Sequence, residues 1–169
     1  MKNTATIYVR SICLLLFMCT VVACSTPTLH SVKLVPNEVT NFFVIDAWVN
    51  DKQGRFLLDT GAARTLISYK FADENWIDRN EDTSIGTVAF GEIKFHTISI
   101  SSFELNTVHG RKLIPLMEVN VHDLTFVNEG LKGVDEQPID GIIGADFLLL
   151  TGATIDYGNL TLSFDVPNL

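Results

Sequence analysis

Turn residues divide this chain into short apolar segments, a pattern that favours strands over helices. Phe42 to Val49 is rich in β-branched and aromatic residues, Asn50 to Gly54 is typical of a turn, and Arg55 to Leu58 resumes the apolar run. These segments predict a hairpin that ends at Asp59. Further strands are predicted at Ile85 to Phe90, Glu92 to Leu105, Lys112 to Val121 and Leu124 to Phe126. Many short strands with almost no helix predict an all-β domain, either a small barrel or a sandwich.

The C-terminal part of the chain is predicted to contain one helix. Asn128 to Pro138, with two glycines, a proline and three acids, is typical of a surface loop. Asp146 to Thr151 predicts a short helix with Asp146 as its cap. Ala153 to Phe164 predicts a closing hairpin that turns around Gly158.

The N-terminal residues differ in kind from the rest. Lys2 and Arg10 precede an apolar run of thirteen residues, Ser11 to Ala23, which meets Cys24. A helix that spans a membrane needs about 20 apolar residues, so residues 1–23 are predicted to be a cleaved secretory signal peptide. Val21 to Cys24 resembles the bacterial lipobox. That resemblance implies lipidation (palmitate) at Cys24, a membrane anchor in the bacterial envelope and, from Ser25, sorting to the outer membrane.

Residues 24–41 are predicted to be a tether to the membrane, and residues 42–169 the folded domain. The tether is polar, contains Pro27 and Pro36, and lacks sustained periodicity, although Val32 to Val35 near its far end is a candidate edge strand. All three cysteines, Cys13, Cys19 and Cys24, lie in or at the end of the leader, so no disulfide is expected in the domain.

The charge of the chain excludes one class of partner. The formal charge is -8 and the sequence pI is about 4.8, and removing Lys2 and Arg10 with the leader takes the charge to -10. A surface that binds nucleic acid carries an excess of cations that neutralise phosphates, so no nucleic acid is expected as a partner.

An acidic residue stands where two strongly apolar segments meet, in Phe56-Leu57-Leu58-Asp59-Thr60-Gly61-Ala62. An ionised carboxylate is costly to bury without partners, so Asp59 is expected at a strand end that faces solvent or in a site with hydrogen bonds. On these residues alone, an ordinary turn that joins two strands is the favoured interpretation.

A second segment about eighty residues downstream, Asp140 to Leu148, favours a functional site at Asp59 over an ordinary turn. With the Asp59 loop it resembles the retropepsin-like aspartic proteases, in which an apolar-apolar-Asp-Thr-Gly-Ala loop presents the catalytic acid. A later apolar-apolar-Gly segment, here Ile142-Ile143-Gly144, packs beside that loop and is followed by a short helix. The resemblance covers about residues 42–164. It implies a small closed barrel of the retropepsin-like acid protease type, with one short helix near the C-terminus.

The resemblance also implies a role for each motif residue. Asp59 is the catalytic carboxylate, Thr60 hydrogen-bonds across a twofold axis, Gly61 permits close approach of the backbone, and Ala62 leaves room for a substrate. The chain supplies one such loop, so the second carboxylate must come from another copy of the chain in a homodimer. Two neighbouring carboxylates share one proton, which is known for aspartic proteases as a class. Ile142, Ile143 and Gly144 are expected to brace the loop.

Two features of the family are less clearly matched. A flap that closes over the peptide is expected at Ser84 to Ile93, with Gly86 and Gly91 as flexible points. Ala63 stands where bacterial relatives commonly carry a hydroxyl, and Ala145 stands where viral relatives carry an arginine.

These features leave two hypotheses. The first is an aspartic endopeptidase that hydrolyses envelope polypeptides through paired Asp59 residues. The second is a catalytically silent lipoprotein that uses the same fold as a peptide-binding or scaffolding module. No cofactor is predicted, and no metal either, because His30, His96, His109 and His122 have no metal-ligand spacing.

Overall fold

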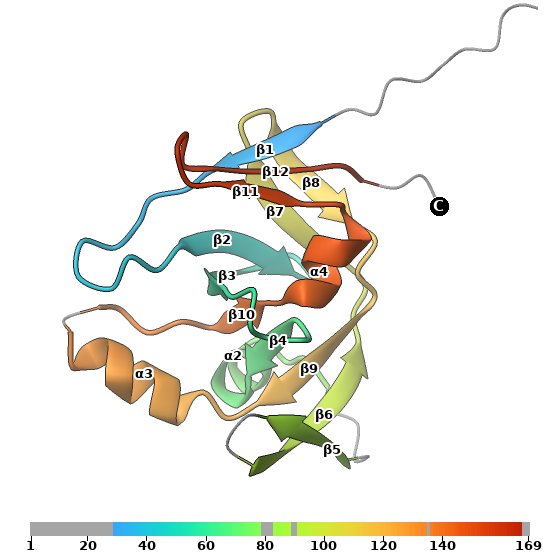
Figure 1. The fold of residues 1–169 in the computed structure, drawn as a ribbon. Coiled ribbons are helices and arrows are strands. Elements are labelled where there is room, and N and C mark those ends of the chain that lie inside the picture. The colour runs from blue at the N-terminus through green and yellow to red at the C-terminus, as the bar shows by residue number, and fades with distance from the viewer. Residues whose placement is uncertain (1–28, 79–82, 89–90, 135, 167–169) are drawn as a thin grey trace, which may run out of the picture.

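Two β-sheets form the body of the molecule, in a computed structural model that describes residues 29–78, 83–88, 91–134 and 136–166 (Figure 1). The larger sheet has nine strands in the order β5-β6-β9-β4-β10-β3-β2-β7-β8. Their bounds, in that order, are Thr83–Val88, Gly91–Ser99, Glu118–His122, Leu66–Ser68, Gly141–Ile143, Lys52–Leu58, Val44–Val49, Phe103–Thr107 and Gly110–Ile114. No helix among the described residues is long and apolar enough to cross a membrane.

The smaller sheet joins the two ends of the domain. β12 (Thr161–Phe164) lies between β1 (His30–Lys33) and β11 (Thr154–Asp156), antiparallel to both. β1 overlaps the candidate edge strand within the segment predicted as a tether. Val32 and Leu34 are 5% and 1% exposed, so this part of residues 24–41 contributes to the core.

The predicted hairpin before Asp59 is confirmed as β2 and β3, and its turn is tighter than the sequence suggested. Asn50 and Asp51 form the turn, both with positive φ, at 49° and 64°. This geometry suits a two-residue connection between twisted strands. The Asn50 side chain stabilises it, because Oδ1 accepts hydrogen bonds from the backbone of Ser101 and Ser102 at 2.7 and 3.2 Å.

The mainly β fold class is confirmed, with two corrections to the expected architecture. The nine-stranded sheet curls into a half-barrel, and in the described residues its end strands β5 and β8 are not paired with each other, so this sheet does not close. Three helices are present instead of one: α2 (Tyr69–Glu74), α3 (Thr125–Lys132) and α4 (Ala145–Leu150). Only α4 was expected.

Helix α3 replaces both the strand predicted at Leu124 to Phe126 and the first part of the predicted loop at Asn128 to Pro138. Leu124 and Leu131 are buried and Val127 is half-buried, a spacing of three and four residues that suits one face of a helix. Glycines within and after the segment had suggested a loop. Burial of this apolar face outweighs the low helix propensity of Gly130.

Aromatic side chains connect the two sheets through α4. Phe56 of β3 contacts Phe103 of β7, Phe103 contacts Phe147 of α4, and Phe147 contacts Phe164 of β12, with ring centroids 5.9, 6.3 and 5.7 Å apart. All four side chains are completely buried. Helix α4 is therefore fixed between the sheets, as Figure 1 shows.

Gly141 in β10 tests how tightly this region is packed. A Cβ atom there would lie 2.3 Å from Phe56 Cε1 and 2.4 Å from the Leu66 carbonyl oxygen. We expect Gly141→Ala to lower the free energy of unfolding by about 3 kcal/mol or more, measured by denaturant titration. Gly130→Ala is the control, since nothing lies within 4 Å of its added methyl group. The control should raise stability by up to about 1 kcal/mol. Equal stability of wild type and Gly141→Ala would contradict the packing.

Candidate active site

The predicted catalytic loop, residues 59–65, begins where three buried strands meet. β10 lies between β3 and β4, parallel to β3 and antiparallel to β4. Ile142 and Ile143 pair with Leu57 and Leu58, and the Asp59 backbone N–H then donates to the Ile143 carbonyl at 3.0 Å. The two isoleucines predicted to brace the loop therefore lie beside it, and the hydrogen bonds between β10 and β3 extend to the first residue of the loop.

The loop turns sharply directly after Asp59. The Gly61 N–H donates to Asp59 Oδ1 at 2.8 Å, and the Ala62 N–H donates to the Asp59 carbonyl at 3.2 Å. Asp59 is half-buried, whereas Thr60 and Gly61 are exposed. Asp59 Oδ2 accepts no hydrogen bond from any residue that the structure describes. One carboxylate oxygen is thus oriented by the backbone, and the other is available to a water, a substrate or a second protein chain.

Gly144 allows the loop to lie directly against the start of α4. A Cβ atom on Gly144 would lie 2.6 Å from the Arg64 carbonyl carbon and oxygen and 2.8 Å from the Ala62 carbonyl oxygen. The Ala145 N–H donates to that Ala62 oxygen at 2.7 Å. Because the contacted atoms belong to the backbone, only glycine fits at position 144.

A buried threonine and an acid hold the other end of the loop, and the sequence did not suggest this pair. Asp146 Oδ1 accepts hydrogen bonds from the Thr65 N–H and the Thr65 hydroxyl, at 2.8 and 2.7 Å. Thr65 Oγ1 in turn accepts from the Gly144 N–H at 3.1 Å, and Thr65 is 0% exposed. The predicted role of Asp146 as the helix cap is wrong, because Gly144 is the N-cap of α4.

The hydroxyl of Thr65 substitutes for the one that bacterial relatives commonly carry at the position of Ala63. Ala63 is exposed and offers no side-chain hydrogen bond. The hydroxyl that ties this loop to the segment 144–146 comes instead from Thr65, two residues later. A missing hydroxyl at position 63 therefore leaves the loop anchored.

The predicted flap segment, Ser84 to Ile93, lies in an antiparallel hairpin of β5 and β6 at one end of the large sheet (Figure 1). Gly86 pairs with Ile93, and Gly91 pairs with Val88. Residues 89 and 90 lie outside the described part of the chain, as does Cys24. β6 continues into the sheet beside β9, which is parallel to β4.

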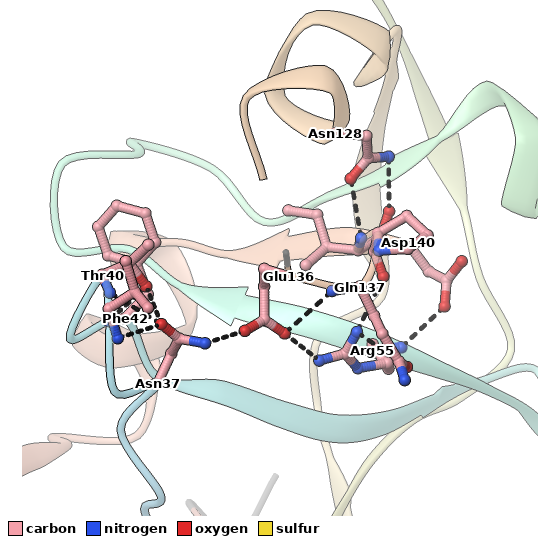
Figure 2. Close-up of polar contacts among 11 residues, drawn as sticks. Asn37, Thr40, Phe42, Arg55, Asn128, Glu136, Gln137 and Asp140 are labelled. Atoms are coloured by element: carbon pink, nitrogen blue, oxygen red, sulfur yellow. Dashed lines mark hydrogen bonds and ion pairs between the residues drawn. The ribbon is translucent and has the colours of Figure 1, made fainter. Parts of the chain in front are cut away.

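A polar network joins Arg55 of β3 to the loop at Asn37 and to the segment 136–140 that precedes β10 (Figure 2). The Arg55 guanidinium donates to Glu136 at 2.9 Å, and the Asn37 side-chain amide also donates to Glu136. The hydrogen bond from Arg55 holds the pKa of Glu136 below its ordinary value. Asp140, which directly precedes β10, accepts a hydrogen bond from the Arg55 N–H at 2.9 Å through Oδ2. Asp140 is thus a structural residue at the start of β10.

Among the described residues, no group of three or more His, Cys, Asp or Glu side chains is arranged to hold a metal ion.

Comparison with known proteins agrees with this geometry. A family model described as aspartyl protease matches residues 45–147, which is more than half of the chain and includes both the Asp59 loop and the bracing segment. The chain belongs to the aspartyl protease family. The resemblance to retropepsin-like proteases is thereby confirmed, and membership of this family supports a protease-type function.

Solved structures support the aspartyl protease fold. A retropepsin-like aspartic protease from Rickettsia conorii matches with a TM-score of 0.54 and 17% sequence identity. The match covers 83% of this chain and 94% of that chain. No protein with a curated description matches.

Thr65 provides the test of how this aspartyl protease loop is held. Thr65→Val keeps the shape of the side chain but leaves Asp146 Oδ1 and the Gly144 N–H each without one hydrogen-bond partner. We expect the free energy of unfolding to fall by about 1–3 kcal/mol. Thr154→Val, at an exposed position of β11, is the control and should change stability by less than about 0.5 kcal/mol. Thermal unfolding of both variants measures this, and equal effects would argue against the Thr65 anchor.

Proposed function

We propose that this protein is an aspartic endopeptidase whose active site forms when two copies of the chain bring their Asp59 carboxyl groups together. The observation that carries the proposal is the state of Asp59 itself. Its Oδ1 is oriented by the Gly61 N–H, and its Oδ2 has no donor within the described chain. The loop tip at Thr60 and Gly61 is exposed, so a second loop has access to it.

Two carboxyl groups about 3 Å apart share one proton, because both cannot ionise easily at that distance. The ionised member removes a proton from water, and the protonated member donates a hydrogen bond to the carbonyl oxygen of the peptide. The water oxygen bonds to the carbonyl carbon. The C–N bond then breaks as the amide nitrogen takes up a proton from the pair.

A homodimer with a twofold axis is the arrangement that supplies this second carboxyl group. Among the described residues, Asp59 makes no hydrogen bond to another carboxyl group. Thr60 is exposed on the same tip, and its hydroxyl is proposed to hydrogen-bond across the axis to the second loop. The β5–β6 hairpin, with Gly86 and Gly91, is proposed to close over the bound peptide.

The location of the protein is proposed from its N-terminal residues. Residues 1–23 are proposed to be removed, Cys24 to carry the lipid, and the domain to face the periplasm from the outer membrane. β1 begins at His30, six positions after Cys24. Six residues reach at most about 20 Å. Substrates are therefore proposed to be envelope polypeptides close to the membrane surface.

The Asp59 carboxyl group is tested by Asp59→Asn. We expect this variant to cleave peptides at least about 100-fold more slowly than wild type, since it lacks the acid and base of the reaction. The measurement is the initial rate of cleavage of a randomised peptide mixture by the full chain, followed by mass spectrometry.

Asp46→Asn is the matched control. It makes the same chemical change at an exposed position of β2 and should cleave at the wild-type rate. Cleavage that persists in Asp59→Asn would remove Asp59 from the mechanism. Peptide binding without any cleavage by wild type would favour the alternative, a silent peptide-binding module.

A further inference from the structure

The three arginines in the described part of the chain have very different surroundings. Arg55 donates to Glu136 at 2.9 Å and also contacts the Pro138 carbonyl at 3.2 Å. Arg111 pairs with Glu104 at 2.8 Å and Asp51 at 3.3 Å, and its guanidinium lies over the Trp48 ring. Arg64 takes part in no hydrogen bond or ion pair with any described residue. Although the chain has a formal charge of -8, no acid among the described residues forms an ion pair with this guanidinium.

Arg64 lies on the catalytic loop, five residues after Asp59. Its backbone is held on both sides, because Gly144 packs against its carbonyl group and the next residue, Thr65, donates to Asp146. The side chain is exposed. A fixed backbone with a free, charged side chain is the arrangement of a binding residue on a rigid support.

Arg64 is one of the residues that line a cavity of about 150 Å³ between the catalytic loop and strands β6 and β9. Phe95 and Val119 supply apolar walls, and Thr97 and Asn120, which hydrogen-bond to each other at 3.0 Å, supply polar ones. Part of the wall therefore comes from β6, the second strand of the hairpin proposed to close over the peptide. A peptide covered by this hairpin would lie between the hairpin and the loop that carries Arg64.

Two acids also line this cavity, and neither neutralises Arg64. Asp146 Oδ1 already accepts hydrogen bonds from Thr65 and from the Phe147 N–H, and its Oδ2 is buried without a hydrogen-bond partner among the described residues. Glu118 is exposed and forms no ion pair with Arg64. Among the described residues that line the cavity, Arg64 is thus the one cation, and its planar fork remains open to a carboxylate.

We propose that Arg64 is a specificity-determining residue that binds an Asp or Glu side chain of the substrate, a few residues from the bond that is cut. This inference rests on the proposed protease function and names a class of substrate for it. Five residues span at most about 18 Å, and the turn at Asp59 to Ala62 shortens that reach. A peptide bound as a strand advances about 3.3 Å per residue, so its acidic residue falls within about five positions of the scissile bond.

The test uses the full chain and a randomised library of ten-residue peptides at about pH 6, where Asp and Glu side chains are ionised. In one arm, wild-type protein digests the library and mass spectrometry maps the cut sites. In the other arm, immobilised Asp59→Asn protein retains peptides without cutting them. We expect Asp and Glu to be enriched about tenfold at one position in both arms, the effect of one charge-assisted hydrogen bond pair.

Variants at position 64 test whether Arg64 is the cause of the acidic preference. Arg64→Gln should remove the enrichment, and Arg64→Glu should replace it with enrichment of Lys and Arg. Lys132→Glu is the matched control, because Lys132 is exposed on α3, away from the loop. This substitution changes the net charge by the same amount as Arg64→Glu. It should leave the wild-type preference intact.

The outcomes separate this inference from the protease function. Cleavage that depends on Asp59 but shows no acidic preference overturns the role of Arg64 and leaves the protease standing. Retention of acidic peptides that depends on Arg64, without cleavage, overturns the protease and keeps Arg64 as a peptide contact. An acidic preference that survives in Arg64→Glu, an equal loss in Lys132→Glu, or no retained peptide at all overturns the role of Arg64.

Discussion

The position of Asp59 depends on β10, a strand of three residues inserted between β3 and β4. These three strands carry the two ends of the proposed catalytic loop and the segment that braces it. β10 is parallel to one neighbour and antiparallel to the other, so its carboxyl end meets the loop at both of the loop's ends. The insertion requires glycine at both ends of the strand, because Gly141 and Gly144 lie against backbone atoms that cannot move aside. A buried and fully paired strand gives the loop a rigid base.

The hydrogen bonds of the loop are distributed unevenly, and this distribution is what links the fold to function. On the inner side, the backbone of Asp59 and Ala62 and the side chain of Thr65 all have partners in the segment 143–146. On the outer side, within the described chain, Asp59 Oδ2 and the Arg64 guanidinium have none. Asp59 is half-buried and Arg64 is exposed, so both groups are accessible to an external partner. The proposals assign each of them an external partner, a second copy of Asp59 and an acidic side chain of the substrate.

Much of the site could be predicted from the sequence because its signals are local. The apolar run that ends in Asp59-Thr60-Gly61 and the later Ile142-Ile143-Gly144 are contiguous motifs, and the hairpin before Asp59 has ordinary strand and turn residues. The anchor between Thr65 and Asp146 could not be predicted, because the partners lie 81 residues apart and each has a common alternative role. The same holds for the contact of Asn37 with Glu136, across 99 residues. Helix α3 was missed because its glycines indicate a loop and its apolar face spans only a few residues.

The central claim is that Asp59 acts only as a pair, and a mixing experiment tests it most directly. Wild-type and Asp59→Asn chains are combined in equal amounts at constant total protein and allowed to exchange subunits, and the rate of peptide cleavage is compared with that of wild type alone. If both carboxyl groups of a homodimer are needed, only about one quarter of the dimers are active and the rate falls to about one quarter. A rate that settles at about one half, the value for chains that act independently, would contradict the claim.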